Sequence, residues 1–227
     1  MRFDAVVLSG GRSSRLGGSP KSELVVGGRS LLELALDAVA GASRVAVVGD
    51  RPVPASGGQA DAAAPDGSAG KILFTREHPR FAGPAAAIAS GIRALERDGA
   101  QETSAGHASR PEDFTAVVAC DMPGVAAAIE ALLTESARVR DSPSIAGFVA
   151  ADENGTAQLL VGLYRTSALR HAIDAREDLV NMSVRSLVSE LELEAVAVPV
   201  GSTHDIDTWE DAARLGAVPP ATEGETL

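Results

Sequence analysis

A glycine-rich loop with three cations follows the first apolar segment of the chain. Gly10 and Gly11 stand at its start, and Arg12, Arg15 and Lys21 follow shortly after them. Adjacent glycines let the backbone approach a ligand closely with its N–H groups pointing toward it. Clustered cations suit a polyphosphate. A phosphate-binding loop is therefore one interpretation, and a flexible Gly/Ser turn with solvated arginines is the other.

Two common phosphate-binding loops do not fit this segment. A P-loop requires G-x-x-x-x-G-K-[ST], and no Gly-Lys pair follows Gly10 or Gly11. A dinucleotide-binding fingerprint requires G-x-G-x-x-G, and Arg12 occupies the place of the second glycine counted from Gly10. One feature favours a functional loop. The chain uses Arg for all its cations except Lys21 and Lys71, and one of these two lysines lies here.

Three aspartates follow apolar segments and could bind a metal ion. Asp121 comes directly after the apolar run 114–120, and Mg²⁺ prefers carboxylate, phosphate and water oxygens. Capping of the following helix is the alternative. Asp205 and Asp207 share one side of an extended segment, because side chains there alternate with period two. Both could face a metal, or Asp207 could cap the helix after Thr208; we expect Asp207 to be a ligand.

The remaining candidates each have an ordinary structural alternative. Gly83 and Pro84 begin an Ala-rich segment, whose free helical N–H groups could approach a base or a phosphate, or simply start a helix. Arg185 could hold the phosphate of an acceptor, or be an exposed helix arginine. Cys120 has no His or Lys partner nearby in the sequence, so we expect a small buried residue and not a nucleophile.

Strand-like and helix-like segments alternate along the chain. Short apolar runs are typical of strands buried on both faces, and we expect strands over 3–8, 44–48, 71–75, 114–120, 144–151, 158–164 and 193–200. Helical spacing predicts helices over 30–40, 83–97, 125–139, 167–175, 183–190 and 208–215. Asn154-Gly155 predicts a hairpin. The alternation predicts an α/β fold of Rossmann-like type, three-layer α/β/α with a mostly parallel, mixed central sheet, whose ligands bind outside the carboxyl ends of the strands.

Two segments show no apolar period. Residues 51–70 are rich in Pro, Gly, Ala and Asp, and we expect a mobile insertion without catalytic residues. Residues 98–113 predict a polar loop. We expect a single domain over 1–216 and a frayed C-terminal tail over 217–227.

Composition argues against several classes of protein. The 227 residues are 45% hydrophobic, enough for a core, and 20 Lys+Arg against 31 Asp+Glu give a formal charge of −11. That sign disfavours nonspecific binding to nucleic acid and to anionic membranes. One cysteine excludes an intrachain disulfide and a multi-cysteine zinc site. No apolar run reaches the roughly 20 residues that cross a bilayer, and the immediate first strand leaves no room for a signal peptide. We expect a cytoplasmic enzyme, a monomer or a weak homo-oligomer.

Four segments, in order along nearly the whole chain, resemble MobA-like nucleotidyltransferases, the molybdenum cofactor guanylyltransferase family. Their loop, roughly L-A-G-G-x-S-x-R-M-G followed shortly by Lys, is similar to residues 8–21, although Ser9 replaces Ala, Leu16 replaces Met and Pro20 stands where Asp is frequent. Their later motifs are similar to Phe81-Ala82-Gly83-Pro84, Ala119-Cys120-Asp121-Met122-Pro123 and Asp205-Ile206-Asp207-Thr208. The family often has an acidic pair where this chain has Glu77-His78, so a base contact differs there.

The resemblance implies a fold of the nucleotide-diphospho-sugar transferase type and a reaction. The reaction is transfer of GMP from GTP to the phosphate of molybdopterin, or of its molybdenum form, with release of pyrophosphate. It also implies Mg²⁺ as cofactor, held by Asp121 and Asp207. Nucleotide contacts are expected from Leu8, Ser9, Gly10, Gly11, Arg12, Ser13, Lys21, Gly83, Pro84 and Asp121, and acceptor contacts from Gln158, Arg185 and Asp205.

Three of these residues are expected to be catalytic. Two phosphate-bearing substrates repel each other, so the site must neutralise charge where they meet. The guanidinium of Arg15 suits the leaving pyrophosphate, Lys21 suits the α-phosphate, and Asp121 would hold the metal ion. Alternatives are a cytidylyltransferase, another NTP transferase acting on molybdopterin or a phosphorylated small molecule, and a non-catalytic nucleotide-binding module. The presence of Arg15, Lys21 and Asp121 argues against the last.

Overall fold

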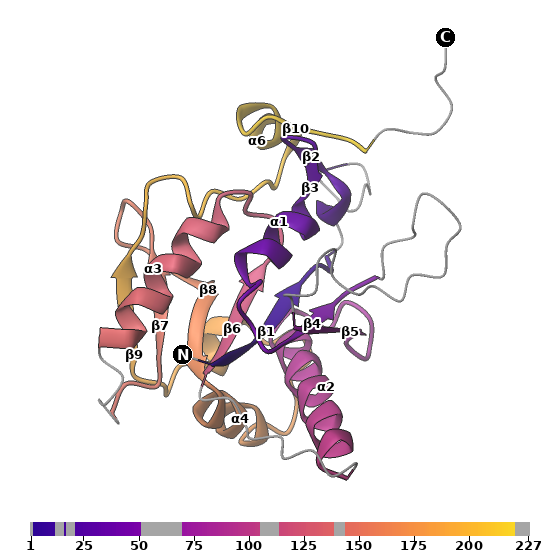
Figure 1. Cartoon of the computed structure of the whole chain (residues 1–227), viewed down its shortest axis with the longest axis vertical. Helices are drawn as coiled ribbons and strands as arrows, with labels where there is room; N and C mark the ends of the chain where they lie inside the picture. Colours follow the sequence, from indigo (N-terminus) through magenta and orange to yellow (C-terminus); the bar gives the residue numbers. More distant parts are fainter. Residues whose placement is uncertain are drawn as a thin grey trace.

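A seven-stranded sheet forms the centre of the molecule, with strand order β5-β4-β1-β6-β8-β7-β9 (Figure 1). The computed structural model describes residues 2–11, 16, 21–50, 70–104, 114–138 and 144–220, of which 101–104 by backbone alone. All neighbouring strands are parallel except the two pairs that β8 makes with β6 and β7. The mostly parallel, mixed sheet is therefore confirmed. The strands are β1 (Phe3–Leu8), β4 (Arg44–Val48), β5 (Lys71–Thr75), β6 (Phe114–Ala119), β7 (Gly147–Ala151), β8 (Ala157–Arg165) and β9 (Leu193–Ala197).

Helices cover both faces of this sheet, which makes the expected three layers. Helices α1 (Leu31–Ala38) and α3 (Val125–Arg138) pack on the face that carries residues such as Val7 and Val118. Helices α2 (Pro84–Ser104), α4 (Thr166–Asp174) and α5 (Val184–Leu187) pack on the face that carries residues such as Val6 and Val117. Every residue of β1 and β6 is buried, which explains why these strands read as continuous apolar runs.

The hairpin predicted at Asn154-Gly155 joins β7 to β8. The Asp152 carboxylate accepts the backbone N–H groups of Asn154, at 2.9 Å, and of Thr156, at 2.8 Å. Gly155 has φ of +78°, a conformation that glycine adopts without steric cost. This turn reverses the chain and makes β8 the antiparallel strand of the sheet.

The expected polar loop over 98–113 is wrong at its beginning, because α2 continues to Ser104. Asp98 is a buried polar residue in this helix, 5% exposed. Its carboxylate pairs with Lys71, and one of its oxygens lies 3.9 Å from Nη1 of Arg44. A charged residue therefore occupies a core-facing position of α2, and it interrupts the helical spacing of apolar residues from which the helix could have been predicted.

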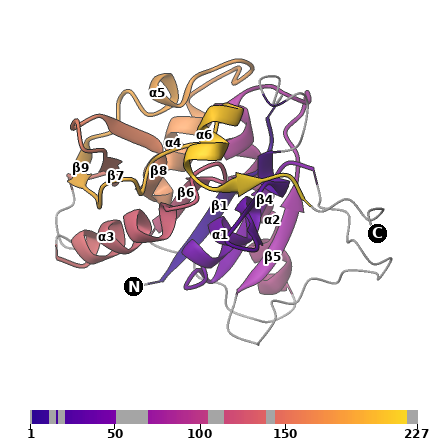
Figure 2. The same cartoon turned by 90° about the horizontal axis from the view of Figure 1, so that it is seen from above.

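A second, three-stranded sheet was not predicted. Its strands are β2 (Val25–Val26), β3 (Arg29–Ser30) and β10 (Ala217–Val218), in the order β10-β2-β3, and each is too short to give a periodic signal. Together with helix α6 (Trp209–Arg214) it lies at the upper end of the molecule in Figure 1 and is seen from above in Figure 2.

The expectation of a frayed tail over 217–227 is wrong at its beginning, because Ala217 and Val218 form β10 and pair with β2. Residues 221–227 and the expected insertion, apart from Gly70, lie outside the described residues. No helix in the described part of the chain is long and apolar enough to span a bilayer.

Candidate active site

A cleft of about 420 Å³ opens at the carboxyl ends of β1, β4 and β6. Such an edge is where open α/β sheets bind ligands. The cleft brings together eight of the residues predicted to contact a nucleotide, and Arg12, Ser13 and Arg15 lie outside the described residues. The lining residues are Leu8, Ser9, Gly10, Gly11, Lys21, Val48, Glu77, Phe81, Gly83, Pro84, Ala87, Ala119, Cys120, Asp121, Leu160 and Asn181.

The glycine-rich loop begins tight against the end of β4. The Ser9 N–H donates to the Val48 carbonyl at 2.9 Å, and the Ser9 hydroxyl donates to the same oxygen at 3.3 Å. A Cβ on Gly49 would lie 2.4 Å from the Ser9 Oγ and 2.8 Å from the Gly10 nitrogen. Only glycine at position 49 allows this approach, which holds Gly10 and Gly11 at the mouth of the cleft.

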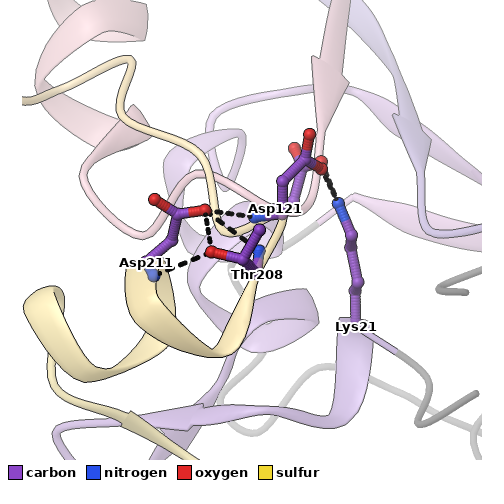
Figure 3. Close-up of polar contacts among 5 residues, drawn as sticks. Lys21, Asp121, Thr208 and Asp211 are labelled. Atoms are coloured by element: carbon purple, nitrogen blue, oxygen red, sulfur yellow. Dashed lines mark hydrogen bonds and ion pairs between the residues drawn. The ribbon is translucent and has the colours of Figure 1, made fainter. Parts of the chain in front are cut away.

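Lys21 lies between two of the three predicted aspartates. Its Nζ is 3.4 Å from Oδ2 of Asp121 (Figure 3), and it also donates to Asp207. Lys21 begins the short 3-10 helix η2 (Lys21–Glu23), whereas Asp121 follows β6 and Asp207 precedes α6. Three distant parts of the chain therefore meet at one point.

Burial and charge shift the pKa values of this pair. Burial alone would lower the pKa of Lys21, but its hydrogen bond to Asp207 and the charges of Asp121 and Asp207 outweigh burial and raise it. Burial raises the pKa of Asp121, and the charge of Asp205 adds to this, while Lys21 opposes it. Lys21 is therefore held as a cation, whereas Asp121 is a carboxylate whose ionised form its surroundings disfavour.

Asp207 is not the cap of helix α6. The N-cap is Thr208, whose hydroxyl accepts the Asp211 N–H at 3.1 Å, while the Asp211 carboxylate accepts the Thr208 N–H at 3.0 Å (Figure 3). The same carboxylate also accepts the Asp207 N–H at 3.3 Å. This capping box leaves the Asp207 side chain to face Lys21. The capping alternative for Asp207 is therefore wrong.

The three aspartates form one cluster. Asp121, Asp205 and Asp207 each offer a carboxylate oxygen, and these oxygens all lie within 4.8 Å of one another. Ile206, between the last two, is completely buried, and its N–H donates to the Asp121 carbonyl at 3.0 Å. Burial of Ile206 turns its two neighbours to the same side, as the period-two argument predicted.

Cys120 lines the cleft, and its side chain is held in the protonated thiol form. It is 4% exposed, and burial, with the neighbouring charge of Asp121, raises its pKa to about 12. The expectation of a small buried residue is confirmed.

None of the three predicted acceptor residues is among the residues that line the cleft. Asp205 belongs to the aspartate cluster. The Gln158 Nε2 donates to Oδ2 of Asp152 at 3.1 Å, in the β7–β8 hairpin, and Arg185 is exposed on α5. The acceptor roles of Asp205, Gln158 and Arg185 therefore stay predictions.

Eight lining residues were not among the predicted site residues, and Glu77, Phe81, Leu160 and Asn181 are four of them. Glu77 and Phe81 lie in the segment before α2, Leu160 lies on β8, and Asn181 lies between α4 and α5. Glu77 and Phe81 stand close to the predicted Gly83-Pro84 turn, which was a usable signal. Leu160 lies in the strand that also carries Gln158, which the resemblance placed at the acceptor, whereas Asn181 comes from a segment without a motif and only the folded chain places it here.

Comparison with known proteins assigns the chain to a family. The model of the MobA-like NTP transferase domain matches residues 5–196, which is most of the sequence. The chain belongs to the MobA-like NTP transferase family. Enzymes of this family are nucleotidyltransferases, and the expected family is thereby confirmed. No curated protein sequence matches the chain at a significant level.

Solved structures share the fold of this family member at low sequence identity. Rv0371c of Mycobacterium tuberculosis has a TM-score of 0.62 at 21% identity, over 95% of this chain and 98% of that one. Molybdopterin-guanine dinucleotide biosynthesis protein A of Archaeoglobus fulgidus has a TM-score of 0.59 at 19% identity, over 93% and 96%. The 2-C-methyl-D-erythritol 4-phosphate cytidylyltransferase of Thermus thermophilus has a TM-score of 0.56 at 18% identity, over 95% and 97%. These likenesses establish the nucleotidyltransferase fold.

Proposed function

We propose that the protein transfers GMP from GTP to the terminal phosphate of molybdopterin, or of its molybdenum form, and releases pyrophosphate. One observation carries this proposal. The glycine loop at the end of β1, Lys21 and Asp121 line a single cleft, and Asp121 is one of the three clustered aspartates, as a polyphosphate site with a metal ion requires. The preference for GTP and molybdopterin is supported by the family and by the fold shared with a molybdopterin-guanine dinucleotide biosynthesis protein.

The reaction needs no protein nucleophile. An oxygen of the acceptor phosphate, already anionic, forms a bond to the α-phosphorus of GTP. The bond from that phosphorus to the oxygen bridging the α- and β-phosphates breaks, and its electron pair leaves with pyrophosphate. The protein has to position two anions and stabilise the charge between them. Cys120, kept as a thiol by its raised pKa, fits this absence of covalent catalysis.

Each part of the cleft has a task in this proposal. The backbone N–H groups of Gly10 and Gly11 bind phosphate oxygens, and Lys21 supplies a compact positive charge at the α-phosphate. Arg15 would bind the leaving pyrophosphate through its forked guanidinium. These positive groups are needed locally, because the whole chain carries a formal charge of −11.

The donor set of the aspartate cluster fits Mg²⁺. Three carboxylates within reach of one another offer the oxygen ligands that this ion prefers. Asp121 and Asp207 would hold it, and Asp205 is the third donor of the cluster. A bound Mg²⁺ supplies positive charge to the phosphate oxygens.

A cytidylyltransferase is the second candidate, because the same fold is shared with a solved cytidylyltransferase. One experiment separates the two: pyrophosphate release from each of the four NTPs, with and without molybdopterin. GTP with molybdopterin should give turnover. Turnover with CTP and none with GTP would assign the protein to the cytidylyltransferases, and nucleotide binding without turnover on any acceptor would indicate a binding module.

A further inference from the structure

The lining of the cleft contains two residues in a strained backbone conformation. Phe81 has φ of +63° and Asn181 has φ of +57°, and they are the only residues other than glycine with positive φ in the described part of the chain. Both line the cleft. Such outliers cluster at ligand sites, where the surrounding structure holds them in place.

Asn181 is clamped to the turn that begins helix α2. Its backbone N–H donates to the Ala82 carbonyl at 2.7 Å. Gly83 lies against the same residue, because a Cβ at position 83 would be in van der Waals contact with the Asn181 Cα, at 3.4 Å. Gly83 also has φ of +94°, which strongly favours glycine. The backbone of Asn181 is therefore fixed at the cleft, while its residue as a whole is exposed.

The other polar side chains of the cleft are already engaged. The Ser9 hydroxyl donates to Val48, and Lys21 and Asp121 pair with each other. Glu77 accepts the Phe81 N–H at 3.0 Å through Oε1. Within the described part of the chain, the Asn181 carboxamide makes no hydrogen bond. It offers both a donor and an acceptor, the combination that matches the edge of a nucleobase.

The surroundings of Asn181 also suit a base more than a phosphate. Nearby on the lining are Phe81, 37% exposed, and Pro84, whereas the cationic Lys21 stands with the aspartates. An exposed aromatic ring is a sequence-tolerant stacking surface for bases. Resting on the proposed function, we propose that the Asn181 carboxamide hydrogen-bonds the base of the bound nucleoside triphosphate and contributes to the choice of base.

The test compares full nucleotides with a probe that has no base. Binding of the four NTPs and of inorganic triphosphate, each with Mg²⁺, is measured by calorimetry on the wild type and on Asn181→Ala, Asn181→Gly and Asn181→Asp. Asn181→Gly keeps the left-handed backbone at no steric cost, and Asn181→Asp keeps the shape while removing both donors. Val180→Ala, an exposed neighbour outside the cleft lining, is the matched control.

We expect Asn181→Ala and Asn181→Gly to weaken the preferred NTP about tenfold and to reduce the ratio between it and the other NTPs. Asn181→Asp should change the order of the four NTPs. The affinity for inorganic triphosphate should differ by less than about twofold between each Asn181 variant and the wild type. Val180→Ala should bind every NTP within about twofold of the wild type. Equal losses for NTP and triphosphate, or unchanged ratios in all three variants, would overturn the role of Asn181. A wild type that binds no NTP would instead overturn the proposed function itself.

Discussion

The ammonium group of Lys21 lies 3.4 Å from the Asp121 carboxylate although 100 positions separate the two residues. The same group pairs with Asp207, 186 positions away. Lys21 thus stands where a divalent cation would compete with it for the aspartates. We infer that Lys21 exchanges these partners for phosphate oxygens when a nucleotide and its metal ion enter the cleft.

Removal of the Lys21 charge should make the aspartate cluster a better metal site in the absence of nucleotide. Lys21→Ala deletes a cation that pairs with two of the three carboxylates, so Mn²⁺ should bind about tenfold more tightly, a change of about 1.4 kcal/mol. The same variant should lower kcat by about 10²-fold or more, because one preorganised charge is lost. Calorimetric titration with Mn²⁺ and steady-state kinetics check the two effects.

Lys71→Ala is the matched control for Lys21→Ala. Lys71 is the only other lysine, begins β5 and pairs with Asp98, far from the carboxyl ends of the strands. It should leave both Mn²⁺ binding and kcat near the wild-type values. Unchanged or weaker Mn²⁺ binding by Lys21→Ala would show that the lysine does not compete with the metal.

Asp121→Asn should abolish most turnover without unfolding the protein. The expected loss in kcat is about 10²-fold or more, because the variant removes a metal ligand from a cleft and not an apolar residue from the core. Arg15→Lys should lower kcat less than Lys21→Ala does, because the positive charge is kept and only the forked geometry of the guanidinium is lost. Near-wild-type turnover of folded Asp121→Asn would rule out the metal role.

The pH dependence of stability should reveal the cost of ionised Asp121. Its pKa is raised above the ordinary value of 3.8 in the folded protein, chiefly by burial. The protonated carboxyl group therefore stabilises the fold below pH 3.8, and this stabilisation is lost as the pH rises through the pKa of the folded protein. Metal-free Asp121→Asn should therefore be as stable as the wild type or more stable at neutral pH, with the difference shrinking on acidification. Urea unfolding in EDTA between pH 4 and 8 measures this, and a clear destabilisation at pH 7 would contradict it.

A second charged network, at the opposite end of the sheet, should matter for stability alone. Arg44 donates to the buried Asp4 at 2.6 Å and lies 3.9 Å from Asp98. Arg44→Ala would leave two buried carboxylates short of a partner and should lower the free energy of unfolding by about 3 kcal/mol. With kcat measured under conditions where the variant stays folded, turnover should be within about twofold of the wild type. Arg138→Ala, whose side chain is 72% exposed, is the control and should change neither quantity.

The sequence predicted the large sheet well because its strands are buried on both faces and are therefore unbroken apolar runs. Elements that depend on buried ion pairs, or that are only two residues long, were not predicted. The sequence predicts a loop at the end of α2, because Asp98 takes a core position there with Lys71 and Arg44 as partners. Strands β2, β3 and β10 have two residues each, too few for any period.

The same distinction applies to the site. Lys21, Asp121 and Asp207 lie at the ends of recognisable segments and were predicted. Asn181 is held at the cleft by a backbone hydrogen bond to Ala82, and such a contact leaves no pattern in a single sequence.

The most direct test follows the α-phosphate itself. GTP labelled at the α-phosphate is incubated with Mg²⁺, molybdopterin and the protein, and the label in the dinucleotide product and the released pyrophosphate are measured together. We predict equal molar amounts of both, dependence on molybdopterin, and loss of both with Asp121→Asn. Label that stays in GTP while the folded protein binds it, or transfer that Asp121→Asn leaves intact, would contradict guanylyl transfer at this cleft.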